Sequence, residues 1–326
     1  MKIFTKSIPL QAIVILAVMF LLWVGPLADP QPMPADAGGA VLYDIIAGWL
    51  APTPLLAVIL AMVLILFEGV ILNLLLADNG LSPQNSRLPT LLYVVCMRAP
   101  ATTLTPMVAA NAMLILCLRQ LMLKGTLLTI STDRACAATA LIGLASLFYL
   151  PAVLLMISYM LTAINYRLYS WKDWAVLFLG FLAPYALLAT VLMFTDGLAG
   201  WWQGVADAIG TAGVNIGEFS AWQAVGNGAL LLALVAGMVS VWNLSSERPV
   251  IWQKNATTLI TLIVGATAML FFTQLFTTDM QFFALPFTFC TACLLMPPVR
   301  SLSQKRRKEW IFVLILILTI AAALIC

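Results

Sequence analysis

The stretch PLLAVILAMVLILFEGVILNLLL, residues 54–76, decides the class of this protein. It is apolar throughout, apart from Glu68 and Asn73. It is also long enough to cross the hydrocarbon core of a bilayer as one helix, which takes about 20 residues. We therefore predict a membrane-spanning helix over Pro54–Leu76, and comparable apolar stretches recur along the chain.

The composition of the chain agrees with this prediction. Of the 326 residues, 63% are hydrophobic and 9% are charged, whereas soluble domains are about 45–50% apolar and about 25% charged. Such a chain cannot cover a water-facing surface with polar groups, so a soluble globular fold is excluded. The net charge of +3 is too small for a nucleic-acid footprint. The chain has no His, the commonest general base and metal ligand.

Further spans can be placed on both sides of residues 54–76. The fold class predicted is an all-α, polytopic bundle of about eleven spans in a single membrane domain, residues 1–326. Besides Pro54–Leu76, the predicted spans are Ile8–Ala28, Pro89–Met97, Pro106–Leu123, two within residues 135–165, Trp174–Phe194, Gln223–Trp242, Ala256–Phe276, Met280–Met296 and Trp310–Ile325. The first could pass for a signal peptide cleaved near Ala35-Asp36-Ala37, but its apolar run is long, which favours an uncleaved span.

Two regions leave the number of spans open. The stretch before Arg98 is too short to cross a bilayer straight, and Pro and Thr residues interrupt the helix between Arg98 and Pro106. Residues 135–165 form either one long helix or a hairpin that turns near Pro151. The hairpin keeps Arg134, Arg167 and Lys172 on one side of the membrane, as the positive-inside rule prefers.

The charges predict the orientation. With the N-terminus in the cytoplasm, every Lys and Arg except Arg98 falls on a cytoplasmic segment. The long outer segments are then residues 29–53, where residues 40–50 predict a surface helix, and residues 195–222. Tyr43, Trp49 and Trp201-Trp202 are typical of an interfacial aromatic belt.

Glu68 is the ionisable residue predicted at mid-membrane depth. Such residues usually face an interior or a water-filled cavity, so Glu68 is a candidate contact for a proton, an ion or a substrate. The alternative is a purely structural Glu, protonated or hydrogen-bonded by Asn111 or Asn227 of other spans. Asn73 is predicted to make an interhelical or helix-end hydrogen bond.

The outer side carries the other candidates. Arg98 could hold a phosphate bidentately, or anchor a helix end to lipid headgroups. Asp36 and Asp44 could act as a general base or metal ligand, although most loop carboxylates are simply solvated.

Cys290 and Cys293 form a C-x-x-C spacing inside an apolar run, which favours ordinary packing over redox or metal chemistry. No nucleotide loop or catalytic triad is present, and the sequence names no cofactor and no metal site.

Three stretches carry a family resemblance: NGLSPQNSRLPTLLYVV (79–95), ALIGLASLFYLPAVLL (140–155) and YSWKDWAVLFLGFLAPYAL (169–187). They resemble an uncharacterised family of integral membrane proteins from Bacteroidetes-type bacteria. That family has no assigned activity, so the resemblance implies a fold and a membrane location only.

The order of parts resembles, more loosely, the membrane half of the GT-C glycosyltransferase superfamily. The matching pieces are the surface helix, the outer turn Arg98–Pro106, and Gly143-Leu144-Ala145 before Pro151. The resemblance implies Asp29 or Asp36 as catalytic base or metal ligand, and Arg98 as the contact for a polyprenyl phosphate. The paired acidic motif of that superfamily is missing here, and Phe148-Tyr149 replaces its basic residue at the hairpin turn.

Three functional hypotheses follow. The first is a bacterial inner-membrane protein of lipid-linked glycan or cell-envelope assembly, with Asp36 and Asp29 as catalytic candidates and Arg98, Glu68 and Asp44 as substrate-binding candidates. The second is a non-enzymatic membrane subunit of an envelope or secretion complex, which would have a membrane-protein partner. The third is a transporter that uses Glu68.

Overall fold

The structure is a computed structural model of the 326-residue chain. It describes residues 8–33, 40–82, 85–98, 103–123, 129–168, 170–210, 221–270, 281, 283–295, 310 and 313. Within these residues every regular element is helical and none is a strand. The all-α fold class is therefore confirmed.

The first half of the chain forms a series of helices of different lengths. These elements are α1 (Ile8–Ala28), α2 (Val41–Leu50), α3 (Pro54–Asp78), α4 (Leu88–Arg98), α5 (Pro106–Leu121), α6 (Thr132–Phe148), the short 3-10 helix η2 (Leu150–Leu154) and α7 (Leu155–Asn165). The second half contains α8 (Trp171–Phe194), α9 (Leu198–Gly210), α10 (Ala221–Ser245), α11 (Val250–Leu270) and α12 (Ala284–Leu295).

Three of the described helices are long and apolar enough to cross a membrane. They are Pro9–Ala28, Pro54–Asp78 and Trp171–Phe194. Each follows a predicted span closely, and together they make this a membrane protein. The predicted span before Arg98 is also as short as expected, because α4 has 11 residues and reaches only about 16 Å along its axis.

Residues 135–165 form a hairpin. The Tyr159 hydroxyl of α7 donates a hydrogen bond to the carbonyl oxygen of Ala135 in α6, over 3.0 Å. In one continuous helix these residues would lie about 36 Å apart, at 1.5 Å per residue. The chain therefore reverses at η2, where Pro151 stands, and the hairpin prediction is confirmed.

Helices α6 and α8 run parallel and pack at van der Waals distance. Thr132 at the start of α6 donates to Asp173 at the start of α8, over 3.1 Å, and Ser146 near the end of α6 lies 2.6 Å from the Tyr185 hydroxyl. Gly143 permits the close approach, because a Cβ there would lie 2.5 Å from the Phe181 carbonyl oxygen. Small residues at helix crossings are the usual device of membrane helices, which lack a hydrophobic drive to associate.

Polar contacts tie the ends of other helices together. Asn255 of α11 is fully buried, and its amide bonds both backbone groups of Leu123, which follows α5. Its Oδ1 accepts from the Leu123 N–H over 2.8 Å, and its Nδ2 donates to the Leu123 oxygen over 3.1 Å. Between α7 and α11, Ser158 donates to the Thr261 carbonyl oxygen over 2.7 Å.

These contacts join segments that the charge pattern puts on the same side of the membrane. Two examples come from the predicted cytoplasmic side and two from the predicted outer side: Gln11 with Asn85 and Arg87, Leu123 with Asn255, Tyr43 with Leu104, and Thr105 with Gln281. The alternation of the helices is thus consistent with the predicted order, whereas the direction of the whole bundle in a membrane stays a prediction.

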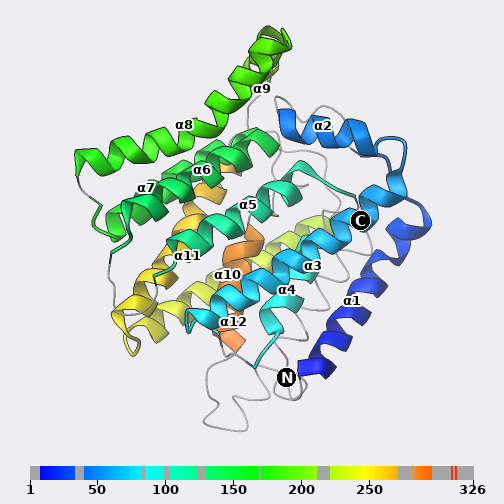
Figure 1. Ribbon diagram of the computed structural model, residues 1–326. Coiled ribbons are helices and arrows are strands. Elements are labelled where there is room, and N and C mark those ends of the chain that lie inside the picture. The colour runs from blue at the N-terminus through cyan, green and yellow to red at the C-terminus, as the bar shows by residue number, and fades with distance from the viewer. Residues whose placement is uncertain are drawn as a thin grey trace.

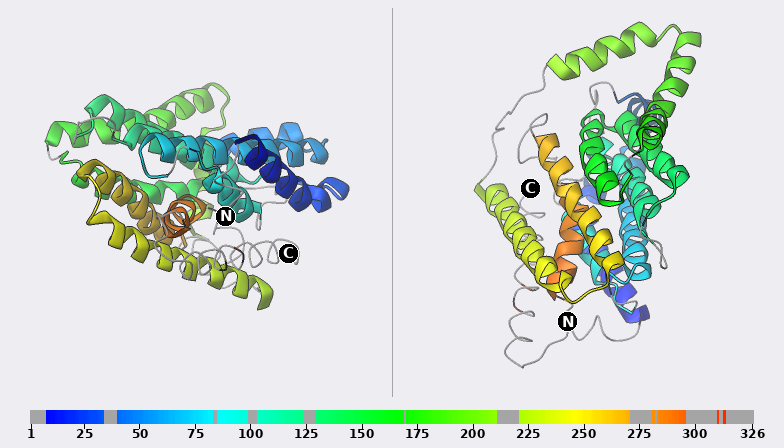
Figure 2. Two further views of the ribbon diagram at one scale, coloured as in Figure 1. Left: turned by 90° about the horizontal axis from the view of Figure 1, so that it is seen from below. Right: turned by 90° about the vertical axis from the view of Figure 1, so that its left-hand side faces the viewer.

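Figure 1 shows the arrangement. Helices α2 and α9 lie at the end of the bundle where α6 and α8 finish, and α9 extends away from it. The side view in Figure 2 places α10 and α11 in a layer beside the helices of the first half. The sequence predicts an outer loop over residues 195–222, but α9 occupies the first part of this segment. The last predicted span, Trp310–Ile325, lies outside the described residues, apart from Trp310 and Val313. The four basic residues Lys305–Lys308, which the orientation prediction puts in the cytoplasm, also lie outside them.

Candidate functional site

A polar group of side chains surrounds the turn between α4 and α5. We call it the turn cluster, and it comprises Tyr43, Thr103, Thr105, Asn111 and Gln281. Its members come from α2, from the turn itself, from α5 and from the residue ahead of α12. Segments far apart in the sequence therefore meet at one end of the bundle.

Tyr43 attaches the surface helix to this turn. Its side chain is fully buried, and its hydroxyl donates a hydrogen bond to the Leu104 carbonyl oxygen over 3.0 Å. Burial, and after it the charge of Asp44, raise the pKa of Tyr43 well above its usual value. The hydroxyl therefore keeps its proton and acts as a donor. Tyr43 is not an exposed belt residue, so that prediction is wrong, whereas Trp49 is 82% exposed.

Thr105 starts α5 and binds Gln281. Its hydroxyl accepts from the Val108 N–H, as an N-cap residue does, and donates to Gln281 Oε1 over 3.2 Å. Nearly two turns further along α5, Asn111 Nδ2 donates weakly to the Gln281 carbonyl oxygen, at 3.4 Å, and to the Met97 sulfur. These bonds hold residue 281 against the start of α5.

Half of each amide in the turn cluster is left unsatisfied. Asn111 Oδ1 and Gln281 Nε2 are buried and have no hydrogen-bond partner among the described residues, and the same holds for Thr103 Oγ1. Buried polar atoms are normally paired, because leaving one unpaired costs about 1–3 kcal/mol. An unpaired acceptor on Asn111 and an unpaired donor on the contacting Gln281 suit a ligand hydroxyl, which donates and accepts at once.

The predicted outer acidic residues that the structure describes are exposed, unlike the buried members of the turn cluster. Asp29 follows α1, is exposed, and accepts a hydrogen bond from Gln31 over 3.1 Å. Asp44 is exposed in the first turn of α2. Asp36 lies outside the described residues. Arg98 is the last residue of α4 and so precedes the turn, but its side chain lies outside the described part.

Glu68 lies elsewhere, between α3 and α4. It is 1% exposed, and its Oε2 accepts a hydrogen bond from the Tyr93 hydroxyl over 2.8 Å. Its position in α3 is about 20 Å along the helix axis from Pro54, so it does not meet the outer carboxylates. The prediction that Asn111 bonds to Glu68 is wrong, because Asn111 belongs to the turn cluster. The side chain of the other expected partner, Asn227, lies outside the described part.

Asn73 makes the helix-end contact that the sequence predicts. With its amide nitrogen facing the loop, it donates to the Ser86 carbonyl oxygen over 3.1 Å, and its oxygen accepts from Arg87 over 3.3 Å. Cys290 and Cys293 are buried free thiols in α12. In the part of the chain that the structure describes, no three His, Cys, Asp or Glu residues gather as a metal site would require.

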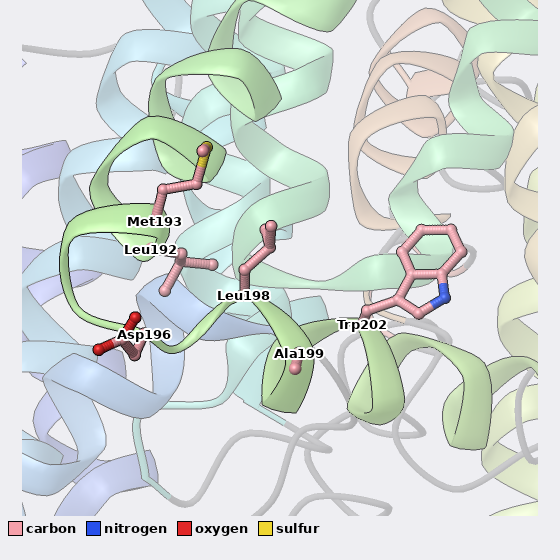
Figure 3. Close-up of a pocket in the computed structure, with 6 residues that line it drawn as sticks. All are labelled: Leu192, Met193, Asp196, Leu198, Ala199 and Trp202. Carbon is pink, nitrogen blue, oxygen red and sulfur yellow. The ribbon is translucent and has the colours of Figure 1, made fainter.

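An open groove lies where α8 meets α9. It has a volume of about 580 Å³, and Figure 3 shows its lining residues: Leu192, Met193, Asp196, Leu198, Ala199 and Trp202. Its surface is apolar except for Asp196, and it lies beside side chains as exposed as Phe194, at 87%. Such a surface fits contact with lipid better than it fits catalysis.

Sequence reasoning missed most of the turn cluster. The sequence marks the threonines between Arg98 and Pro106 only as helix-breaking residues, and Asn111 only as a possible partner for Glu68. Gln281 stands in a predicted span without any motif around it. A polar residue within an apolar stretch is the one signal that could have drawn attention to Asn111 and Gln281.

No protein-family model, no curated protein and no solved structure matches this chain. Any account of its function therefore rests on its own residues.

Proposed function

We propose that the protein is a multi-pass bacterial inner-membrane protein, with about eleven spans and a GT-C-like arrangement, that acts in lipid-linked glycan or cell-envelope assembly. One observation carries this proposal. In the turn cluster, the buried acceptor Asn111 Oδ1 and the buried donor Gln281 Nε2 have no partner among the described residues, and the two side chains belong to residues that are in contact. This pair suits the hydroxyl groups of a sugar.

The other residues have defined roles in this proposal. Arg98 ends α4 beside the turn and would bind the phosphate of a polyprenyl lipid. Asp36 or Asp29 would deprotonate the acceptor, and Asp44 would contact the substrate from the surface helix. Tyr43 supports the arrangement, since it joins the surface helix to the turn. Glu68, which the sequence suggested as a further substrate contact, lies apart from these residues, packed between α3 and α4.

The alternative is a non-enzymatic membrane subunit of an envelope or secretion complex. The exposure of Asp29 and Asp44, neither of which is buried in the turn cluster, favours it. In that case the outer carboxylates are dispensable, and exposed apolar helix faces contact a membrane-protein partner. Substitutions in the turn cluster and at the outer charged residues therefore distinguish the two proposals.

The first test is complementation of a deletion strain combined with a profile of its extracted lipids. We expect the deletion to change the polyprenyl-linked glycans, and Asn111→Leu or Gln281→Leu to fail to restore them. Each substitution removes one unsatisfied buried atom but also one hydrogen bond, from Asn111 to the Gln281 carbonyl oxygen or from Thr105 to Gln281, so thermal unfolding of each purified variant is measured in parallel. Loss of function without loss of stability identifies a binding role.

The matched control is Asn165→Leu, which removes a half-buried Asn that bonds the Lys254 carbonyl oxygen outside the turn cluster. It should restore the lipid profile. Asp36→Asn and Arg98→Ala complete the set. Unchanged glycans in the deletion strain would contradict the glycan proposal, and full function of every expressed variant would favour the non-enzymatic subunit.

The second test concerns orientation. Reporter fusions after Leu50 and after Lys308 should report the outer side and the cytoplasm, respectively. This is expected because every basic residue except Arg98 falls on the predicted cytoplasmic side. The opposite pattern would overturn the orientation and place the turn cluster in the cytoplasm.

A further inference from the structure

The carboxyl group of Glu68 is the one acidic group that the described structure buries inside the bundle. The side chain is 1% exposed. Its Oε2 accepts the hydrogen bond from Tyr93, but its Oε1 is buried and has no partner among the described residues. An ionised carboxylate would need several donors to replace its hydration, and here it has one.

The surroundings of Glu68 are tightly packed. Thr90 of α4 donates to the Gly69 carbonyl oxygen over 3.1 Å, directly beside Glu68. A Cβ on Gly69 would lie 3.3 Å from the Tyr93 ring and 3.4 Å from the Thr90 carbonyl oxygen. Gly69 thus lets α4 approach closely, and this approach places the Tyr93 hydroxyl on the carboxyl group.

Among the described side chains, the neighbouring helices bring no compensating cation to this depth. Helix α1 has no charged residue, and the one charge of α2, Asp44, is exposed. The one charge of α5, Arg119, stands in its last turn. On α4, Tyr93 and Cys96 are the titratable groups on this side, and both are neutral in their protonated forms. The nearest described cation is Arg87 ahead of α4, whose guanidinium bonds Asn73, about 7.5 Å along α3 from Glu68, and not the carboxyl group itself.

We propose that Glu68 is a reversible proton-binding site, with the proton on Oε1 and the Tyr93 hydroxyl on Oε2. A neutral carboxylic acid fits this site better than a carboxylate, since its carbonyl oxygen accepts the bond from Tyr93 and no charge is buried, although its O–H finds no acceptor among the described residues. Release of the proton leaves a charge on the packed face between α3 and α4. The protonation state of Glu68 therefore affects how tightly α4 packs against α3. Because α4 ends at Arg98 and leads into the turn cluster, this change reaches the turn.

The test is infrared spectroscopy of the purified full-length protein in lipid vesicles. A protonated carboxyl gives a C=O stretching band separate from carboxylate bands, and an exposed Glu is ionised at neutral pH. We expect such a band at neutral pH in the wild-type protein and its loss in Glu68→Gln. Tyr93→Phe should move the band to higher frequency, because the carbonyl oxygen loses its hydrogen bond.

Two further measurements, a pH titration and a control variant, complete the test. Raising the pH should remove the band and lowering it again should restore it, which needs no substitution. Glu247→Gln, which changes an exposed Glu in the turn before α11, should leave the band unchanged. The proposal is overturned if the wild-type protein lacks the band at neutral pH, or if the band does not respond to pH.

Discussion

Gly143→Val should separate α6 from α8 and strongly destabilise the protein. A Cβ at this position would lie 2.5 Å from the Phe181 carbonyl oxygen and 3.3 Å from the Pro184 ring. The nearest atom belongs to the backbone of α8, so no side-chain rotation relieves the overlap. We expect a loss of about 3 kcal/mol in the free energy of unfolding, at the upper end of overpacking effects.

Thermal unfolding of the detergent-solubilised protein measures this change. Gly25→Val is the matched control, because Gly25 is an exposed helical glycine and a Cβ there meets nothing within 4 Å. It should change stability by no more than about 0.5 kcal/mol. Equal stabilities of the two variants would show that α6 and α8 do not pack as described.

Asn255→Leu should detach the end of α5 from α11. The Asn255 side chain is the partner of both backbone groups of Leu123, at 2.8 Å and 3.1 Å, and it is fully buried. Leucine has a similar volume but leaves a buried N–H and a buried C=O without partners. At about 1–3 kcal/mol for each of the two unsatisfied groups, we expect a loss of about 2–6 kcal/mol in the free energy of unfolding.

The same unfolding measurement tests this prediction. Asn243→Leu serves as the control, since Asn243 is exposed near the end of α10. It should leave the unfolding temperature nearly unchanged. If Asn255→Leu were as stable as the wild-type protein, the contact between α5 and α11 would have to be formed by other groups.

Helix positions were the part of the structure that the sequence predicted well. The predicted span Ile8–Ala28 coincides with α1, and the predicted span Pro54–Leu76 lies within α3. The hairpin at Pro151 followed from Arg134, Arg167 and Lys172. These predictions succeed because hydrophobic length, proline and charge act locally or through the membrane as a whole.

The partners of single side chains were predicted poorly. Tyr43 is as amphipathic as Trp49, so composition assigns both to an interface, yet only Trp49 is exposed. Asn111 was expected beside Glu68, but the order in which helices pack brings it to Gln281, 170 residues away. The partner of Glu68 is Tyr93 on the next helix, which no sequence spacing distinguishes from other aromatic residues.

The sequence by itself determined that this is an all-helical membrane protein, since 63% hydrophobic residues and 9% charges leave no water-facing surface. It also placed most of the described helices, because a span is a local property of about 20 residues. Only the tertiary structure decided which helices touch. The closeness of α6 to α8 depends on Gly143, and the turn cluster depends on residues from distant segments. Such contacts are set by packing between helices, which no single stretch of sequence encodes.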